Sequence, residues 1–284
     1  MAVRSTTSAT DHALKYIGAL PDPEIPLADA ALWLARWMDP DVKIAPYRRH
    51  LEQLVRDVRH YIANDTDDIK LVLEAVRQIL ARRYGYQGDD AADERHFAAS
   101  MSRTIDRRRG SATTLSILYA HVLAKLAWRV ELLDFAPRTL VGITSQGGRT
   151  IIDPFDTGRT LSARDLRTLL QAQEGIKQEL RPDTLKGLSK RDALLILQHD
   201  VKIHHLRHAA PEAALHAIEG ALFVAPQAAT LWRELGLLHA RLDHLIDAAD
   251  ALERFLQLPG AEAHRYTASQ MLQQLRQRIA RERT

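Results

Sequence analysis

The 284-residue chain is 46% hydrophobic and 26% charged, which is typical of a globular protein, and its length predicts about two domains. It carries 39 basic and 36 acidic residues, of which 28 and 25 lie in residues 1–190 and 11 of each lie beyond. Neither part has the concentrated positive charge that nucleic-acid binding requires, so no nucleic-acid partner is expected. Because the sequence has no cysteine, disulfides, thiolate metal sites and thiol nucleophiles are excluded.

The beginning of the chain has no apolar run of the kind found in a signal peptide, and no stretch reaches the roughly 18 apolar residues of a membrane span. We therefore expect a cytoplasmic protein that does not associate with a membrane. Residues 1–24 are rich in Ser, Thr and Ala and then in Pro, a composition that predicts a weakly ordered leader.

Helical periodicity begins near Leu27, and the first helix is expected to end at Asp39, because the residue before a proline avoids the helical conformation. Further helices are predicted from about residue 46, over about 67–83 and over 113–127.

The spacing changes after residue 128. Segments 129–134, 138–144 and 149–153 are short, rich in β-branched residues and separated by turn sequences, so they predict three antiparallel strands. Helix returns over 161–173, with Ser162 as the expected N-cap.

From about residue 191 the sequence predicts helix throughout and contains an internal repeat. Trp232, Leu235, Gly236, Ala248 and Phe255 have the spacing of the characteristic positions in the tetratricopeptide (TPR) repeat of about 34 residues. Small and apolar residues recur one period earlier. The pattern predicts about two repeats followed by a terminal helix over 262–282.

Several short motifs occur in the order typical of one protein family. They are the segments 105–119, with its stretch of three arginines and a glycine, 140–141, 151–155 and 158–162. In these motifs the chain resembles the SirB-type branch of the transglutaminase-like superfamily, whose bacterial members combine a transglutaminase-like domain with TPR-like helices. The resemblance implies an α+β fold, with a mostly helical papain/transglutaminase-like domain and small antiparallel sheet over residues 25–188, then an all-α TPR-like domain over 189–284.

Active enzymes of this superfamily use a Cys-His-Asp triad, with the cysteine at a helix N-terminus where its pKa is lowered. The resemblance places Ala112 at the cysteine position and Arg138 at the histidine position, and only Asp153 matches the third member. A guanidinium stays protonated and cannot act as a base. We therefore expect an inactive site in which Arg138 pairs with Asp153 and in which both, with Arg109, contribute to binding.

Thr113 and Thr114 offer an alternative, a hydrolase or acyl transferase with a hydroxyl nucleophile. That reaction needs a base, for which His96 and His121 are the candidates. The simpler interpretation is that the two threonines cap the helix.

Eight of the 13 histidines follow residue 198. His204 and His208 have the i, i+4 spacing that can hold zinc if a third ligand approaches, but no HExxH motif is present. Exposed or core histidines are the simpler interpretation, and no metal or cofactor is expected.

The expected function is binding. We expect an inactive transglutaminase-like protein that holds a protein or peptide, in a regulatory role, through its TPR-like helices and its vestigial cleft, with Trp232 among the contact residues. The alternatives are the threonine-dependent enzyme and a purely structural assembly module.

Overall fold

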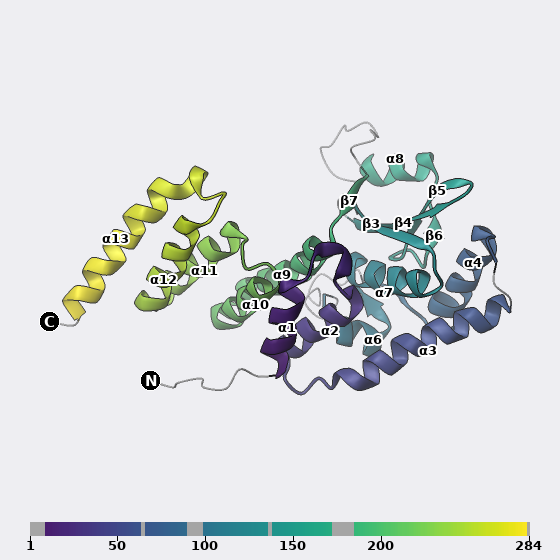
Figure 1. The fold of residues 1–284 in the computed structure, drawn as a ribbon, viewed down its shortest axis with the longest axis horizontal. Helices are drawn as coiled ribbons and strands as arrows, with labels where there is room; N and C mark the ends of the chain where they lie inside the picture. The colour runs from purple at the N-terminus through teal and green to yellow at the C-terminus, as the bar shows by residue number, and fades with distance from the viewer. Residues whose placement is uncertain (1–8, 64–65, 90–98, 136–137, 172–184, 283–284) are drawn as a thin grey trace. The chain divides into compact units, whose positions relative to one another are not determined.

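The computed structural model describes residues 9–63, 66–89, 99–135, 138–171 and 185–282 (Figure 1). Its contacts divide the chain into two compact units. Residues Pro21–Leu197 form one, here called the sheet unit, and Met1–Leu20 together with Gln198–Thr284 form the other, here called the repeat unit. Among the described residues, no helix is long and apolar enough to cross a membrane.

The sheet unit is built of helices around one small sheet. Its helical segments are η1 (Asp22–Glu24), α2 (Leu27–Met38), α3 (Ile44–Ile62), α4 (Ile69–Val76), the π-helical η2 (Arg77–Arg83), α6 (Met101–Arg107), α7 (Ala112–Lys125), α8 (Ala163–Gln171) and the start of α9 (Lys190–Arg207). The prediction of helices from near Leu27, from about 46, over 67–83 and over 113–127 is confirmed to within a few residues. The helix predicted over 67–83 differs in one respect: it begins as α4 and changes to π-helical geometry over its last seven residues, which form η2.

The five-stranded sheet has the order β6-β5-β4-β3-β7, with every neighbouring pair antiparallel. Its strands are β3 (Arg129–Phe135), β4 (Arg138–Ser145), β5 (Gly148–Asp153), β6 (Arg159–Thr160) and β7 (Lys186–Leu188). The three predicted strands are thus confirmed as β3, β4 and β5. A separate parallel pair joins β1 (Gln87–Gly88) to β2 (Arg109–Gly110), immediately before α7.

The sheet unit has its central helix, α7, in contact with β3 and β4. Nine of the helix's 14 residues are buried, which explains why apolar residues occur around most of its circumference. Strands β3 and β4 are joined to helix α8 by an apolar cluster that includes Leu133, Phe135, Leu140, Leu166 and Leu170. The expected N-cap of α8 is confirmed, since Ser162 Oγ accepts a hydrogen bond from the Asp165 amide (3.2 Å) and the Asp165 carboxylate accepts one from the Ser162 amide (2.8 Å).

The repeat unit is a series of helices. They are α1 (Ala9–Ala19), the end of α9, α10 (Pro211–Val224), α11 (Ala229–Arg241), α12 (Leu245–Gln257), the short η5 (Glu262–His264) and α13 (Arg265–Glu282). Among them α10 contacts α11, α11 contacts α12 and α12 contacts α13. Close approach of α11 and α12 depends on Gly236, because a Cβ at this position would lie 2.8 Å from Leu252 Cγ. The close contact explains why the TPR pattern has a glycine at this position. The predicted terminal helix is confirmed as α13.

The predicted leader needs a correction. Residues 9–19 of the expected weakly ordered segment form helix α1, with Leu14 and Ile17 buried, and α1 contacts α10. The stabilising partner lies about 200 residues away in the sequence, so local composition gave no sign of it.

Candidate functional site

The start of α7 lies directly beside the start of β4. Thr113 Oγ1 lies 2.8 Å from Thr139 Oγ1, and Ser116 Oγ donates a hydrogen bond to the Thr139 carbonyl (2.7 Å). Ala112 and Arg138 are the chain neighbours of the two threonines that touch. The fold therefore brings two of the three predicted triad positions to the same place.

Arg138 and Asp153 form the ion pair that the sequence predicted. Asp153 is fully buried; its Oδ2 accepts a hydrogen bond from Arg138, and its Oδ1 accepts one from the Phe155 amide (3.0 Å). The Arg138 guanidinium also lies over the Phe155 ring, 4.6 Å from its centroid. This arrangement pairs the buried carboxylate with a cation, and the guanidinium of Arg138 stays protonated, so it cannot act as a base.

The Phe155 ring also packs against β1. The Gly88 amide donates to the Phe155 carbonyl (3.0 Å), and a Cβ at Gly88 would lie 2.5 Å from the ring. The turn that carries Asp153 and Phe155 is therefore packed against the β1–β2 pair, and the Arg138 side chain is held between fixed groups.

Ser111, rather than Thr113 or Thr114, caps α7. Its side chain accepts a hydrogen bond from the Thr114 amide (3.2 Å), so the expectation that the threonines cap the helix is wrong. Both threonines are buried instead. Thr113 contacts a second hydroxyl, as described above, and Thr114 Oγ1 donates to the Ser111 carbonyl (3.1 Å).

Of the two candidate bases for a threonine site, His121 lies too far from Thr113 to serve. His121 is eight residues after Thr113 on α7, which separates them by about 12 Å along the helix axis. His96 lies outside the described residues. The hydrogen bonds described above join Thr113 Oγ1 to a hydroxyl and Thr114 Oγ1 to a carbonyl, and neither of these groups acts as a general base.

The arginine run before α7 takes part in the packing of the sheet unit. Arg108 has a left-handed backbone (φ 60°), and its guanidinium donates to His50 Nε2 (2.8 Å) and lies 5.0 Å from the centroid of the Tyr86 ring. Burial and the charge of Arg108 lower the pKa of His50 to about 4. The predicted binding residue Arg109 is exposed and belongs to β2.

Two sequence profiles match the chain, and together they cover most of its length. Residues 45–199 match the transglutaminase-like superfamily, and residues 201–275 match the tetratricopeptide repeat. The chain belongs to the transglutaminase-like superfamily. The α+β architecture with TPR-type helices after the sheet is accordingly the one that the sequence predicted.

Relatives of similar length occur in bacteria. A protein of Xylella fastidiosa strain 9a5c named UPF0162 protein is 26% identical over 255 residues, which cover 85% of this chain and 87% of the relative. A UPF0162 protein of Pseudomonas aeruginosa is 27% identical over 219 residues, covering 76% and 78% of the two chains. One from Vibrio cholerae is 24% identical over 228 residues, covering 79% and 83%. No solved structure matches the chain.

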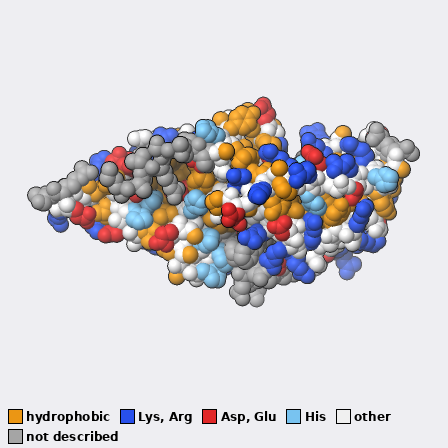
Figure 2. All heavy atoms as spheres, turned by 90° about the horizontal axis from the view of Figure 1, so that it is seen from below, with side chains coloured by type: hydrophobic (Ala, Val, Ile, Leu, Met, Phe, Trp, Pro, Cys, Tyr) orange, Lys and Arg blue, Asp and Glu red, His pale blue; other side chains and the backbone are white. Residues whose placement is uncertain are grey.

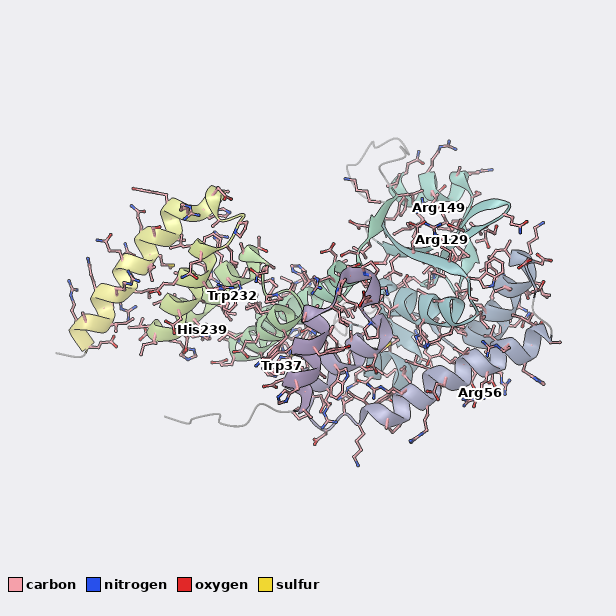
Figure 3. The ribbon with its side chains drawn as sticks, in the orientation of Figure 1. Trp37, Arg56, Arg129, Arg149, Trp232 and His239 are labelled. Atoms are coloured by element: carbon pink, nitrogen blue, oxygen red, sulfur yellow. The ribbon has the colours of Figure 1, made fainter. Side chains whose placement is uncertain are left out.

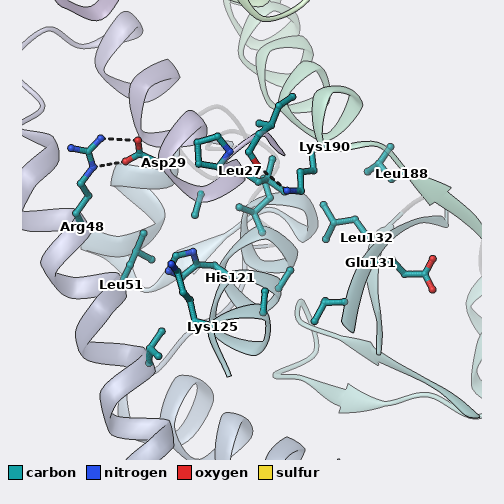
Figure 4. Close-up of a pocket in the computed structure, with 18 of the residues that line it drawn as sticks. Leu27, Asp29, Arg48, Leu51, His121, Lys125, Glu131, Leu132, Leu188 and Lys190 are labelled. Carbon is teal, nitrogen blue, oxygen red and sulfur yellow. Dashed lines mark hydrogen bonds and ion pairs between the residues drawn. The ribbon is translucent and has the colours of Figure 1, made fainter. Parts of the chain in front are cut away.

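In this transglutaminase-like chain a groove, which the sequence analysis missed, borders the C-terminal half of α7. It has a volume of about 910 Å³, and its walls come from α2, α3, the second half of α7, β3 and β7 (Figure 4). Apolar side chains such as Leu51 and Leu132 form much of its lining, while Lys125 and Glu52 supply charge. Ala112, Arg138 and Asp153 do not line it, so this opening is separate from the three positions compared with the triad.

Two cationic side chains at the rim of the groove, Arg48 and Lys190, are already engaged by other groups. Arg48 and Asp29 form a two-point ion pair, with Nε–Oδ1 and Nη2–Oδ2 distances of 2.5 and 2.7 Å. Lys190 Nζ donates to the carbonyls of Pro23 (2.7 Å) and Ile25 (2.8 Å), which ties the start of α9 to the segment before α2. His121 projects from α7 among these groups (Figure 4), and burial, then the charge of Lys125, lower its pKa.

Trp232 is part of the helix packing. The indole N–H of Trp232, which is labelled in Figure 3, donates to the Pro226 carbonyl (2.9 Å). The partly buried ring packs against two apolar clusters, one of which contains Phe255 and the other Leu215. These contacts explain the tryptophan without a ligand, so its predicted binding role gains no support.

Histidines are most numerous over the repeat helices on the face drawn in Figure 2. His204 and His208 stack with ring centroids 4.0 Å apart, and His208 Nδ1 lies 2.9 Å from the His204 carbonyl, so one ring nitrogen is already engaged by the helix. Within the described part of the chain, the set of three possible metal ligands that lie together is a different one, formed by His239, His244 and Asp247.

Proposed function

We propose that this chain is a catalytically inactive member of the SirB-type branch that acts by binding a protein or peptide. The observation that carries the proposal is the ion pair between Arg138 and Asp153, at the positions of the base and its partner in active relatives. Ala112 supplies only a methyl group at the nucleophile position. Acyl transfer through a cysteine intermediate needs a sulfur and a neutral base, and these three positions provide neither.

Binding is supported by the TPR-type helices over residues 201–275. Stacked helix pairs of this kind form extended surfaces, and such surfaces commonly hold peptides. We propose the groove beside α7 as a second binding surface, because its volume of about 910 Å³ and its mixed apolar and charged lining suit a short peptide segment. A cytoplasmic location is part of the same proposal.

The catalytic half of the proposal is tested with the full-length chain, a glutamine-containing peptide and a fluorescent primary amine, and separately with an activated ester. The expected result is no turnover above the rate without protein. Turnover that is lost in Thr113→Val or Thr114→Val, but retained in the surface variant Arg109→Ala, would overturn it and favour the threonine-dependent enzyme.

The binding half requires a partner. Crosslinking in the native host followed by mass spectrometry identifies candidates, and the affinity of each purified candidate is then measured. Ala124→Trp fills the groove from an exposed position on α7, whereas Ala45→Trp adds the same side chain at an exposed position of α3 outside the groove. A peptide held in the groove is expected to lose at least about tenfold in affinity with the first variant and to keep its affinity with the second.

A partner whose affinity neither variant changes is assigned to the repeat unit. If no candidate binds the purified chain, the proposed binding function is wrong.

A further inference from the structure

Three metal-binding side chains meet at the turn between α11 and α12. His239 lies near the end of α11, His244 immediately precedes α12, and Asp247 belongs to the first turn of α12. The Nδ1 atoms of the two histidines are 3.2 Å apart, and the ligand atoms of all three residues lie within 4.8 Å of one another. Figure 3 labels His239, which projects from the repeat helices.

The backbone of the turn holds these groups in place. The amide of His244 donates to the carbonyl of His239 (3.0 Å), so a hydrogen bond joins the same two residues whose rings face each other. Between them Asp243 has a left-handed backbone (φ 62°), which reverses the chain direction. After the turn Leu245 is buried and fixes the first residue of α12. The arrangement of the two rings thus follows from the fold.

The geometry matches a zinc ion bonded to both rings. For Zn–N bonds of about 2.0–2.1 Å, a separation of 3.2 Å between the two nitrogens corresponds to an N–Zn–N angle of about 100°, close to the tetrahedral value. A carboxylate is the third ligand type that zinc accepts beside imidazole.

We propose that His239, His244 and Asp247 bind a divalent transition-metal ion, with zinc as the best match. His244 and Asp247 are exposed, so the ion has a path from solvent, and a fourth coordination position stays open to water or to a side chain of a bound partner. Because the ligands come from two successive helices, the metal links α11 to α12. This site was missed in the sequence because the two histidines are five residues apart on either side of a turn, which is not the spacing of a one-helix site.

The test uses the full-length chain without an affinity tag, after removal of metals with a chelator. Isothermal titration with zinc chloride is expected to show one ion per chain, bound at micromolar or lower concentration. His244→Ala is expected to weaken binding at least about tenfold, and Asp247→Asn to weaken it in the same direction. His208→Ala is the matched control, since it also removes one exposed histidine from the repeat unit and is expected to bind zinc like the unchanged chain.

A second readout separates a specific site from loose surface binding. Zinc is expected to raise the unfolding temperature of the unchanged chain and of His208→Ala, but not that of His244→Ala, because a ligand that binds the folded state alone stabilises it. Circular dichroism establishes that each variant is folded. The proposal is overturned if no zinc binds, if His244→Ala binds as tightly as the unchanged chain, or if His208→Ala weakens binding equally.

Discussion

Replacing Arg138 with methionine tests whether the ion pair with Asp153 stabilises the fold. Methionine keeps much of the aliphatic volume of arginine but removes the charge and the donor. The fully buried carboxylate of Asp153 then keeps its hydrogen bond from the Phe155 amide and loses its positive partner. A buried charge without its counter-ion is among the few single changes that destabilise a protein strongly.

The size of the effect follows from the exposure of the two partners. Removing one member of a buried pair typically costs about 3–5 kcal/mol, but the Arg138 side chain is 27% exposed, so water screens part of the interaction. Loss of the contact between the guanidinium and the Phe155 ring adds about 0.5–1 kcal/mol. We expect the free energy of unfolding to fall by about 3 kcal/mol in total.

Urea unfolding followed by tryptophan fluorescence measures the change, since three of the four tryptophans (Trp33, Trp37 and Trp128) lie in the sheet unit. The matched control is Arg149→Met on the same sheet, whose pair with Glu131 is 36% and 43% exposed and is expected to contribute less than about 1 kcal/mol. If both variants lose the same stability, the buried pair has no special role and the reasoning fails.

Three further changes test other parts of the structure. The pKa of His50 is lowered to about 4 in the folded chain from an ordinary 6.5, so between these pH values the unfolded chain binds a proton that the folded chain does not. The free energy of unfolding is therefore full above pH 6.5 and declines by on the order of 2 kcal/mol toward pH 4. Urea titrations at several pH values should show that His50→Gln removes this decline, and an unchanged pH profile would contradict the reasoning. Gly236→Val forces a side chain against Leu252 and should cost about 1–3 kcal/mol, whereas an unchanged melting temperature would show that the two helices can separate freely. Leu14→Ala should cost about 2–4 kcal/mol if α1 is part of the folded repeat unit, and no loss would restore the predicted leader.

The elements that could be predicted from the sequence are those whose buried residues recur at the regular spacing of a helix or a strand. The strands β3, β4 and β5 were recognisable from β-branched segments between turn residues, and α2, α3 and α7 from their apolar spacing. Helix α1 was not, because its two fully or almost fully buried side chains, Leu14 and Ile17, are covered by the distant α10. Composition describes the local chain and carries no information on such a partner.

The functional residues likewise include some that could be predicted from the sequence and some that could not. The pairing of Arg138 with Asp153 was predictable, since the motif order places them on neighbouring antiparallel strands. The ligand set at His239 and His244 was not, because it depends on a left-handed residue that turns one ring toward the other. A spacing rule derived from straight helices does not describe ligands that meet across a turn.

Helix α7 connects the two parts of the functional proposal. At its first turn the hydroxyl of Thr113 lies against that of Thr139, beside the ion pair of Arg138 and Asp153. At its second half, two turns further on, His121 and Lys125 line an opening of about 910 Å³. We infer that selection for binding, rather than for acyl transfer, explains why polar groups are mutually satisfied at one end of this helix while the other end borders open volume. The contrast predicts that substitutions at Lys125 alter partner affinity, which is measured as in the groove experiment, whereas substitutions at Thr113 alter stability alone.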